Sequence, residues 1–130
     1  MTGVQTCALP ILLVLVLSLT GCSTVQNLFM AEYDTSEYAL VTKVRSVAQL
    51  RKCDEPSVKE LYSSSLQLKN FSQYLPRNEK TYQMNTELNS MVEELYKKPQ
   101  PVSQFYCDLK LKTIETTAEN IQSVTGKRPR

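Results

Sequence analysis

Four cysteines are the residues of this chain best suited to chemistry, and no histidine accompanies them. They are Cys7, Cys22, Cys53 and Cys107. The lack of histidine removes the usual general base and the commonest neutral metal ligand. Isolated cysteines without CxxC spacing make a poor zinc site, and a cysteine nucleophile would have no histidine partner. We therefore expect no catalytic residue, no metal site and no cofactor.

Neighbouring carboxylates are the other candidates for acid–base chemistry. They are Glu93, Glu94, Glu115 and Glu119. Lys97 and Lys98 follow the first two at i+4, which is the spacing of ion pairs on a solvated helix face. We interpret these glutamates as surface charge. The run Ser63-Ser64-Ser65 has no G-x-S-x-G context, so we interpret it as a polar helix face.

These residues belong to a chain with two unlike parts. All 15 basic and 13 acidic residues lie in 22–130, and residues 1–21 carry no charge. The apolar run Ile11–Leu19 is too short to span a bilayer as a helix, but it fits the hydrophobic region of a secretory signal. The composition therefore predicts a signal peptide over 1–21, followed by one small soluble domain.

The end of the apolar run, Leu19-Thr20-Gly21-Cys22, resembles the lipobox of bacterial lipoprotein precursors. The resemblance implies diacylglyceryl transfer to the Cys22 thiol, cleavage between Gly21 and Cys22, and acylation, typically with palmitate, of the new amine. Two or three acyl chains, at about 0.8 kcal/mol per buried CH₂, would anchor the protein stably. The alternative is a signal-anchor helix in which Cys22 is incidental.

Residues 1–10 lack the lysine or arginine with which a signal peptide opens. The segment Met1–Ile11 resembles the conceptual translation of a common sequencing-library adapter. This resemblance implies that 1–11 are not native and that Cys7 carries no biology. The alternative is a genuine n-region of unusual composition.

The residue after the lipidated cysteine bears on location. In Gram-negative lipoproteins an Asp at this position retains the protein in the inner membrane, whereas this chain has Ser23. The resemblance therefore implies a lipid anchor in the outer membrane, on its periplasmic side. A Gram-positive cell surface is the alternative.

With Cys7 and Cys22 assigned, Cys53 and Cys107 are left as an even pair in an exported domain. Because the periplasm is oxidising, the pair predicts one disulfide. Closing a loop of about 55 residues would stabilise the fold by roughly 4 kcal/mol in the chain-entropy treatment.

The prolines divide 34–126 into blocks with apolar residues at helical spacing. We expect an all-α, up-down bundle of about four helices, over 36–53, 57–75, 79–97 and 102–124. Short connections make successive helices antiparallel, so Cys53 and Cys107 fall at one end of the bundle. The expected helix starts are Asp34, Asp54 or Glu55, and Asn78, with Pro101 near the start of the last helix. The apolar residues expected to face the core include Leu50, Phe105, Leu109 and Val124.

Two segments flank the expected bundle. Residues 22–33 form the lipidated tether, whose apolar residues are Val25, Leu28, Phe29 and Met30. These side chains could pack on the bundle, enter the headgroup region of the membrane or contact a partner. Residues 127–130 form a basic tail. A net charge of +2 with one short basic cluster gives no case for nucleic-acid binding.

These features favour a non-enzymatic lipoprotein, held on the membrane by its N-terminal lipid, that binds a protein partner in the cell envelope. The alternative is an exclusion or interference lipoprotein of a phage or plasmid, which blocks a receptor or a transfer channel. The segments Glu37–Val41 and Phe105–Lys110 resemble small phage-encoded lipoproteins, which have no recorded activity.

Overall fold

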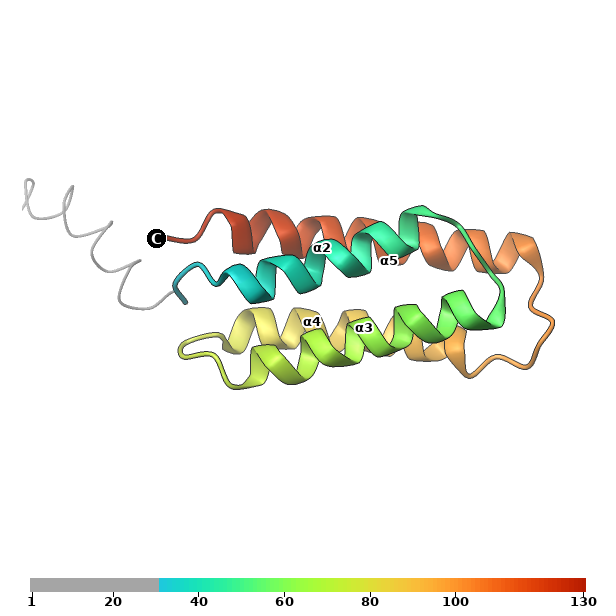
Figure 1. Cartoon of the computed structure of the whole chain (residues 1–130), viewed down its shortest axis with the longest axis horizontal. Helices are drawn as coiled ribbons and strands as arrows, with labels where there is room; N and C mark the ends of the chain where they lie inside the picture. Colours follow the sequence, from blue (N-terminus) through green and yellow to red (C-terminus); the bar gives the residue numbers. More distant parts are fainter. Residues whose placement is uncertain (1–30) are drawn as a thin grey trace, which may run out of the picture.

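The structure is a computed structural model that describes residues 31–130. The lipobox, the expected cleavage site and Met1–Ile11 lie outside the described residues. Four helices make up the fold, which confirms the all-α prediction (Figure 1). They are α2 (Thr35–Gln49), α3 (Glu55–Gln73), α4 (Glu79–Tyr96) and α5 (Gln104–Gly126).

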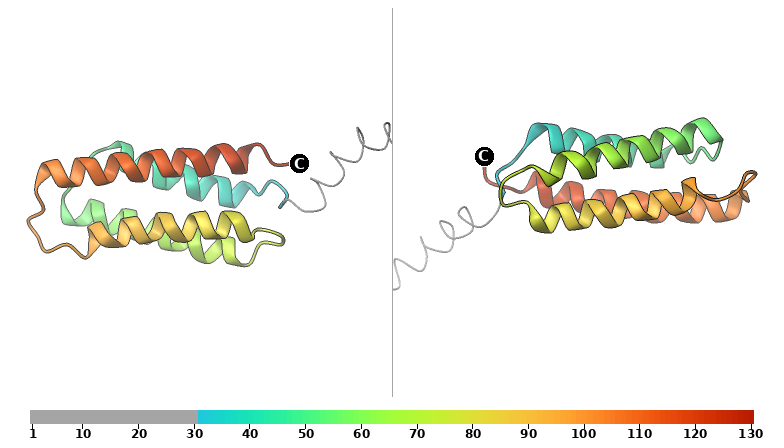
Figure 2. Two further views of the ribbon diagram at one scale, coloured as in Figure 1. Left: turned by 180° about the vertical axis from the view of Figure 1, so that it is seen from behind. Right: turned by 90° about the horizontal axis from the view of Figure 1, so that it is seen from below.

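The helices form an up-down bundle in which each helix packs against two others. Helix α2 packs on α3 and α5, and α4 packs on the same two helices. The loops α2–α3 and α4–α5 meet at one end, which we name the disulfide pole (Figure 2). The C-terminus, the start of α2 and the α3–α4 loop meet at the other end, which we name the terminal pole (Figure 1). Both ends of the described chain therefore lie at the same pole.

Side-chain caps explain where three of the helices begin. Asp34, Asp54 and Ser103 each accept a hydrogen bond from the backbone N–H three residues later, at 2.8, 3.1 and 3.2 Å. Such caps satisfy N–H groups that the first turn of a helix leaves unpaired. Asn78 precedes α4 as predicted, but its side chain makes no cap bond, because its Oδ1 accepts a hydrogen bond from Arg128 instead.

Helix α2 is shorter than predicted. It ends at Gln49, and the backbone N–H groups of Leu50 and Arg51 bond to carbonyls three residues back, which tightens the last turn. Arg51 then adopts a left-handed conformation with φ 52°, which turns the chain out of the helix. Cys53 consequently lies in the α2–α3 loop rather than in a helix.

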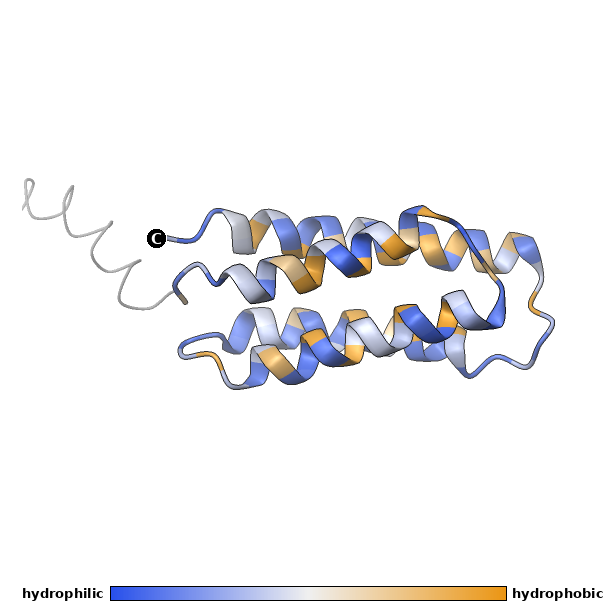
Figure 3. Cartoon of the chain, in the orientation of Figure 1, coloured by the Kyte–Doolittle hydropathy of each residue, from blue (hydrophilic) through white to orange (hydrophobic). Residues whose placement is uncertain are grey.

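The core is a continuous cluster of aliphatic side chains from all four helices. Hydrophobic and hydrophilic residues alternate along every helix, as in amphipathic helices (Figure 3). The largest fully buried apolar side chains are Leu61, Leu68, Leu88, Leu95, Leu111, Ile114 and Ile121. Their burial supplies the main driving force for packing the helices together.

Four residues expected in the core are exposed instead. Leu50 is 61% exposed and Phe105 is 76% exposed, while Leu109 and Val124 are also open to solvent. At 3.6 residues per turn, Phe105 lies about 200° around the helix from the buried Cys107, so it points outward. Spacings of three and four therefore identified the helix but included residues from its outer side.

The interior also contains a polar layer that the apolar pattern did not predict. Ser63 is exposed, whereas Ser64 and Ser65 are buried, so the polar face formed by the serine run lies partly inside the bundle. The Asn89 amide donates to the Ser65 hydroxyl at 3.0 Å, joining α4 to α3. Asn85, one turn earlier on α4, is fully buried, and its amide has no hydrogen-bond partner within the described part of the chain.

Candidate functional site

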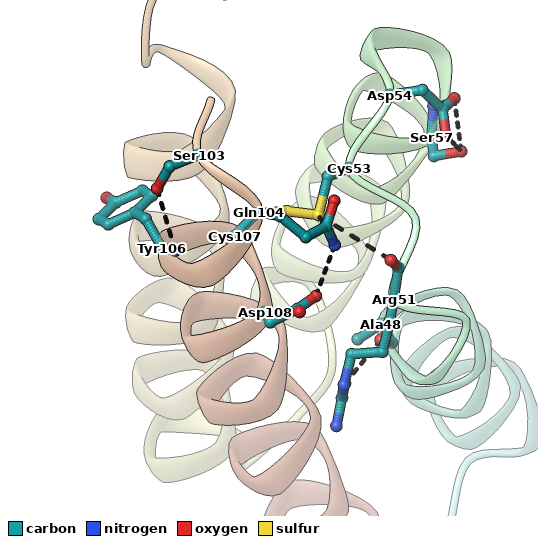
Figure 4. Close-up of a disulfide and its surroundings, with 10 residues drawn as sticks. All are labelled: Ala48, Arg51, Cys53, Asp54, Ser57, Ser103, Gln104, Tyr106, Cys107 and Asp108. Atoms are coloured by element: carbon teal, nitrogen blue, oxygen red, sulfur yellow. Dashed lines mark hydrogen bonds between the residues drawn. A yellow bond between two sulfur atoms is a disulfide. The ribbon is translucent and has the colours of Figure 1, made fainter. Parts of the chain in front are cut away.

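The predicted disulfide is present at the disulfide pole. Cys53 in the α2–α3 loop is bonded to the buried Cys107 of α5, with an S–S distance of 2.03 Å (Figure 4). The Gln104 amide lies beside it, donating to Asp108 Oδ1 at 2.8 Å and approaching the Cys53 sulfur at 3.4 Å (Figure 4). The disulfide therefore connects the loop after the first helix to the start of the last helix.

Glu115 and Glu119 each face an arginine, one in the turn that follows α2 and one within α2. Arg51 pairs with Glu115, and Arg45 lies 3.5 Å from Glu119. Arg45 also donates to Gln122 at 2.7 Å. The hydrogen bond from Arg51 holds the pKa of Glu115 below its usual value. An acid–base pair needs one carboxyl to stay protonated, so these contacts fit an electrostatic seam between α2 and α5 better.

The glutamates of α4 are also paired. Lys97 lies 2.6 Å from Glu93, which confirms the expected i,i+4 pair. Glu94 pairs instead with Lys110 of α5 at 2.6 Å, and this hydrogen bond lowers the pKa of Glu94. Lys98, its expected partner, lies over the ring of an α5 tyrosine. The predicted pair was replaced because packing brings a lysine from the neighbouring helix within reach.

A buried polar cluster lies at the terminal pole. The Arg128 guanidinium donates to Glu37 Oε1 at 2.8 Å, to Asn78 Oδ1 at 2.5 Å and to the Thr81 hydroxyl. The Asn78 amide donates in turn to Glu37 Oε2 at 2.6 Å and to the Ser72 carbonyl at 3.0 Å. We name Glu37, Asn78, Thr81 and Arg128 the terminal cluster. It connects α2, the start of α4 and the chain that follows α5.

The C-terminal residues are therefore part of the fold and not a free basic tail. The Arg128 side chain is only 3% exposed. The Tyr33 backbone N–H donates to the Pro129 carbonyl at 2.9 Å, and the Arg130 guanidinium lies 4.4 Å from the Tyr33 ring centroid. The segment before α2 and the segment after α5 thus hold each other at the terminal pole.

Sequence analysis missed the terminal cluster, although one residue pointed to it. Glu37 lies four residues before the buried Val41, so it falls on the buried stripe of its helix. Burial raises the pKa of Glu37, and the nearby Arg128 charge and the Asn78 hydrogen bond oppose that rise. Both carboxylate oxygens are occupied by hydrogen bonds, so the cluster fits a structural role better than a catalytic one.

A pocket of about 460 Å³ adjoins the terminal cluster. Its walls come from the residue that begins the described chain, the α3–α4 loop, the first turn of α4 and the end of α5. The lining residues are Ala31, Arg77, Glu79, Lys80, Thr81, Val124 and Arg128. The wall is mainly apolar, with charged groups of both signs at its rim. We name it the terminal pocket.

Comparison of the chain with protein-family models, curated proteins and solved structures finds no match. Within residues 31–130, no helix is both long and apolar enough to cross a membrane. The same residues contain no group of three or more acidic or cysteine side chains that could hold a metal ion. The features that bear on function are accordingly the disulfide-bonded bundle, its exposed apolar residues and the terminal pocket.

Proposed function

We propose that this protein is a lipid-anchored, non-enzymatic module that binds a protein partner in the bacterial envelope. The lipobox-like motif Leu19–Cys22 is the observation that carries the proposal. Lipid on Cys22 would hold the bundle at the membrane, on the periplasmic side of the outer membrane. The oxidised Cys53–Cys107 pair supports this compartment, because disulfides persist where the environment is oxidising.

The position of the chain ends supports a definite orientation. Only residues 23–30 separate Cys22 from Ala31, which lies at the terminal pole. The nine residue steps from Cys22 to Ala31 span less than about 33 Å even when fully extended. In this proposal the terminal pole faces the membrane, and the disulfide pole points away from it.

The disulfide pole carries apolar side chains suited to a partner. Leu50, Tyr96, Phe105 and Leu109 are all exposed there, at the ends of α2 and α4 and the start of α5. Phe105 and Leu109 are one helical turn apart on the outer side of α5. Aromatic residues such as Tyr96 and Phe105 are enriched in the buried centres of protein interfaces. The pairing of the glutamates described above supports a role without catalysis.

Metabolic labelling tests the anchor. Cells expressing the full chain are given a clickable palmitate analogue, and the label on the protein is compared with that on Cys22→Ser. We expect label in the parent only, and a double Cys53→Ala, Cys107→Ala variant should keep it because its lipidation site is intact. Equal labelling of parent and Cys22→Ser, or no label in either, contradicts the proposal.

Site-specific photocrosslinking tests the partner surface. p-Benzoylphenylalanine is placed at Phe105 or, as the control, at Tyr74, which is also exposed but lies near the terminal pole. We expect one discrete envelope protein crosslinked from position 105, and a lower yield when Leu109→Asp is added. The same pattern from both positions, or no product from position 105, contradicts a partner at the disulfide pole.

A further inference from the structure

The α3–α4 loop, residues 74–78, carries an exposed aromatic side chain. Tyr74, the residue that follows α3, is 83% exposed, more than any other large hydrophobic side chain among residues 31–130. Leu75 beside it is half-buried, and Pro76 is exposed. We name Tyr74, Leu75 and Pro76 the loop tip. It lies at the terminal pole, at the same end of the bundle as the C-terminus (Figure 1). The tyrosine ring would gain from any contact that removes it from water.

Hydrogen bonds hold the loop tip in place. The backbone N–H groups of Tyr74 and Leu75 donate to carbonyl groups three residues back, at 3.3 and 3.4 Å. The Asn78 amide donates to the Ser72 carbonyl at 3.0 Å, and Asn78 itself belongs to the buried terminal cluster. A contact made by the loop tip therefore costs little conformational entropy, because the loop is already ordered.

The loop tip also lies beside the segment through which the described chain enters the fold. A crevice of about 140 Å³ is lined by residues 31–34 on one side and by Leu75, Pro76 and Arg77 on the other. Arg77 lies 3.9 Å from Glu32 of the entering segment. Lipid on Cys22 would therefore keep the loop tip close to the bilayer, where a high effective concentration favours even a weak contact.

The charged residues around the loop tip carry both signs. Arg77 and Lys80 are exposed, and so are Glu32 and Glu79. The centres of protein interfaces are depleted of charged residues, so this composition does not suit a protein partner. Phosphatidylethanolamine presents a phosphate and an ammonium group in its headgroup, and these can pair with side chains of both signs. The surroundings of the loop tip therefore fit the headgroup layer of a bilayer.

We propose that the loop tip is a membrane-contact surface, with the Tyr74 ring lying just beneath the phospholipid headgroups. Tyrosine is enriched at membrane–water interfaces because its ring is apolar and its hydroxyl is polar. The inference rests on the lipid anchor of the proposed function and goes beyond it, because the anchor alone would let the bundle stand away from the bilayer. Contact at the loop tip would hold the terminal pole against the bilayer and leave the disulfide pole free for a partner.

Tryptophan fluorescence tests the contact, because the chain has no tryptophan of its own. Tyr74→Trp places the fluorophore at the loop tip, and Phe105→Trp is the matched control, since Phe105 is 76% exposed at the disulfide pole. The full, lipid-modified proteins are purified from cell membranes and reconstituted in vesicles of phosphatidylethanolamine and phosphatidylglycerol. Parallel vesicles carry bromine atoms at the headgroup end of the acyl chains. We expect blue-shifted emission, and loss of most of it to bromine, for Tyr74→Trp and neither change for Phe105→Trp.

A second variant tests the loop tip as a unit. Pro76→Asp is added to Tyr74→Trp, and because Pro76 is exposed, the bundle should fold as circular dichroism can check. A carboxylate at the depth of the ring must lose water, so quenching by bromine should fall and the emission should shift back towards that of a ring in water. Thr116→Asp adds the same charge at an exposed position in the middle of α5 and should change neither.

The outcomes separate this inference from the proposed function. Palmitate labelling is measured on the same proteins. Label without quenching of Tyr74→Trp, or with equal quenching of Tyr74→Trp and Phe105→Trp, overturns the membrane contact and leaves the anchor intact. Quenching that is insensitive to Pro76→Asp also overturns the contact. Absence of label contradicts the anchor, and the membrane contact that rests on it is then rejected as well.

Discussion

Arg128 Nη1 lies 2.8 Å from Glu37 Oε1, although the two residues are 91 positions apart along the chain. The pair joins the C-terminal segment to the first turn of α2. At the other pole, the disulfide joins the loop that follows α2 to the first turns of α5. In an up-down bundle the first and last helices share no connecting loop, so this seam depends on side chains. It is held ionically at one pole and covalently at the other.

Arg128→Ala is predicted to destabilise the bundle strongly. Removing the guanidinium leaves the Glu37 carboxylate buried without its counter-charge, and breaking a buried pair in this way costs about 3–5 kcal/mol. Urea denaturation followed by circular dichroism measures the change in the free energy of unfolding. Lys127→Ala, which removes a neighbouring exposed cation, should change it by less than about 0.5 kcal/mol. Equal effects of the two substitutions would show that Arg128 is not buried in the folded protein.

The pH dependence of stability is predicted to carry a contribution from Glu37. Burial raises the pKa of Glu37 above its usual value of 4.5. A carboxyl with a raised folded pKa contributes stability that is complete below the unfolded pKa and is lost as the pH rises through the folded pKa. The parent should therefore gain stability relative to Glu37→Gln as the pH falls from about 7 to about 4.

Glu94→Gln supplies the control of opposite sign. The hydrogen bond from Lys110 lowers the pKa of Glu94, so its contribution is present above the unfolded pKa and is lost as the pH falls. Relative to Glu94→Gln, the parent should lose stability on acidification. Denaturation curves at several pH values measure both differences. If both stability differences between parent and variant changed in the same direction with pH, the raised pKa of Glu37 would be contradicted.

The double variant Cys53→Ala, Cys107→Ala is predicted to fold but to be less stable than the parent. The disulfide joins residues 54 positions apart. Removing it increases the conformational entropy of the unfolded chain, which lowers the free energy of unfolding by about 4 kcal/mol in the chain-entropy treatment. Reduction of the parent with dithiothreitol should lower the free energy of unfolding by a similar amount, which is seen as a lower urea midpoint. A midpoint that changes in neither experiment would mean that the disulfide does not limit the unfolded chain.

Asn85→Leu is predicted to stabilise the protein. The Asn85 amide is fully buried and has no hydrogen-bond partner among the described residues, so replacing it by an aliphatic side chain of similar size should gain about 1–3 kcal/mol. Asn89→Leu is the comparison, because Asn89 donates to the buried Ser65 hydroxyl. We expect no gain there, since Ser65 would lose that donor. Thermal denaturation of the three proteins distinguishes the outcomes, and a loss of stability in Asn85→Leu would contradict the prediction.

The order of the helices and the position of the disulfide were predictable because both depend on local patterns. Helical spacing and the caps at Asp34 and Asp54 identify the elements, and the alternating direction of the helices brings Cys53 and Cys107 to one pole. The terminal cluster was not predictable in this way. A charge on the buried stripe, such as Glu37, shows that a partner is needed. The sequence does not show which basic residue is that partner, because this depends on how distant segments of the chain pack.

The exposed residues were mispredicted for a related reason. The apolar spacing of α5 admits two sides of the helix, and only the position of its neighbours decides that Phe105 points outward. The same holds for the buried Ser64 and Ser65, which face α4 because of how the two helices meet.

The response of the molecule to mechanical load would depend on two links between the first and last helices. They are the Glu37–Arg128 pair and the Cys53–Cys107 disulfide. A force drawing residue 31 away from residue 130 would first meet the Tyr33–Pro129 hydrogen bond and the Glu37–Arg128 pair. Once these yield, the first and last helices would peel apart towards the disulfide pole. The covalent bond stops the peeling there, so tension would bypass α3 and α4. Helices α3 and α4 would lie outside the segment of the chain that carries the load.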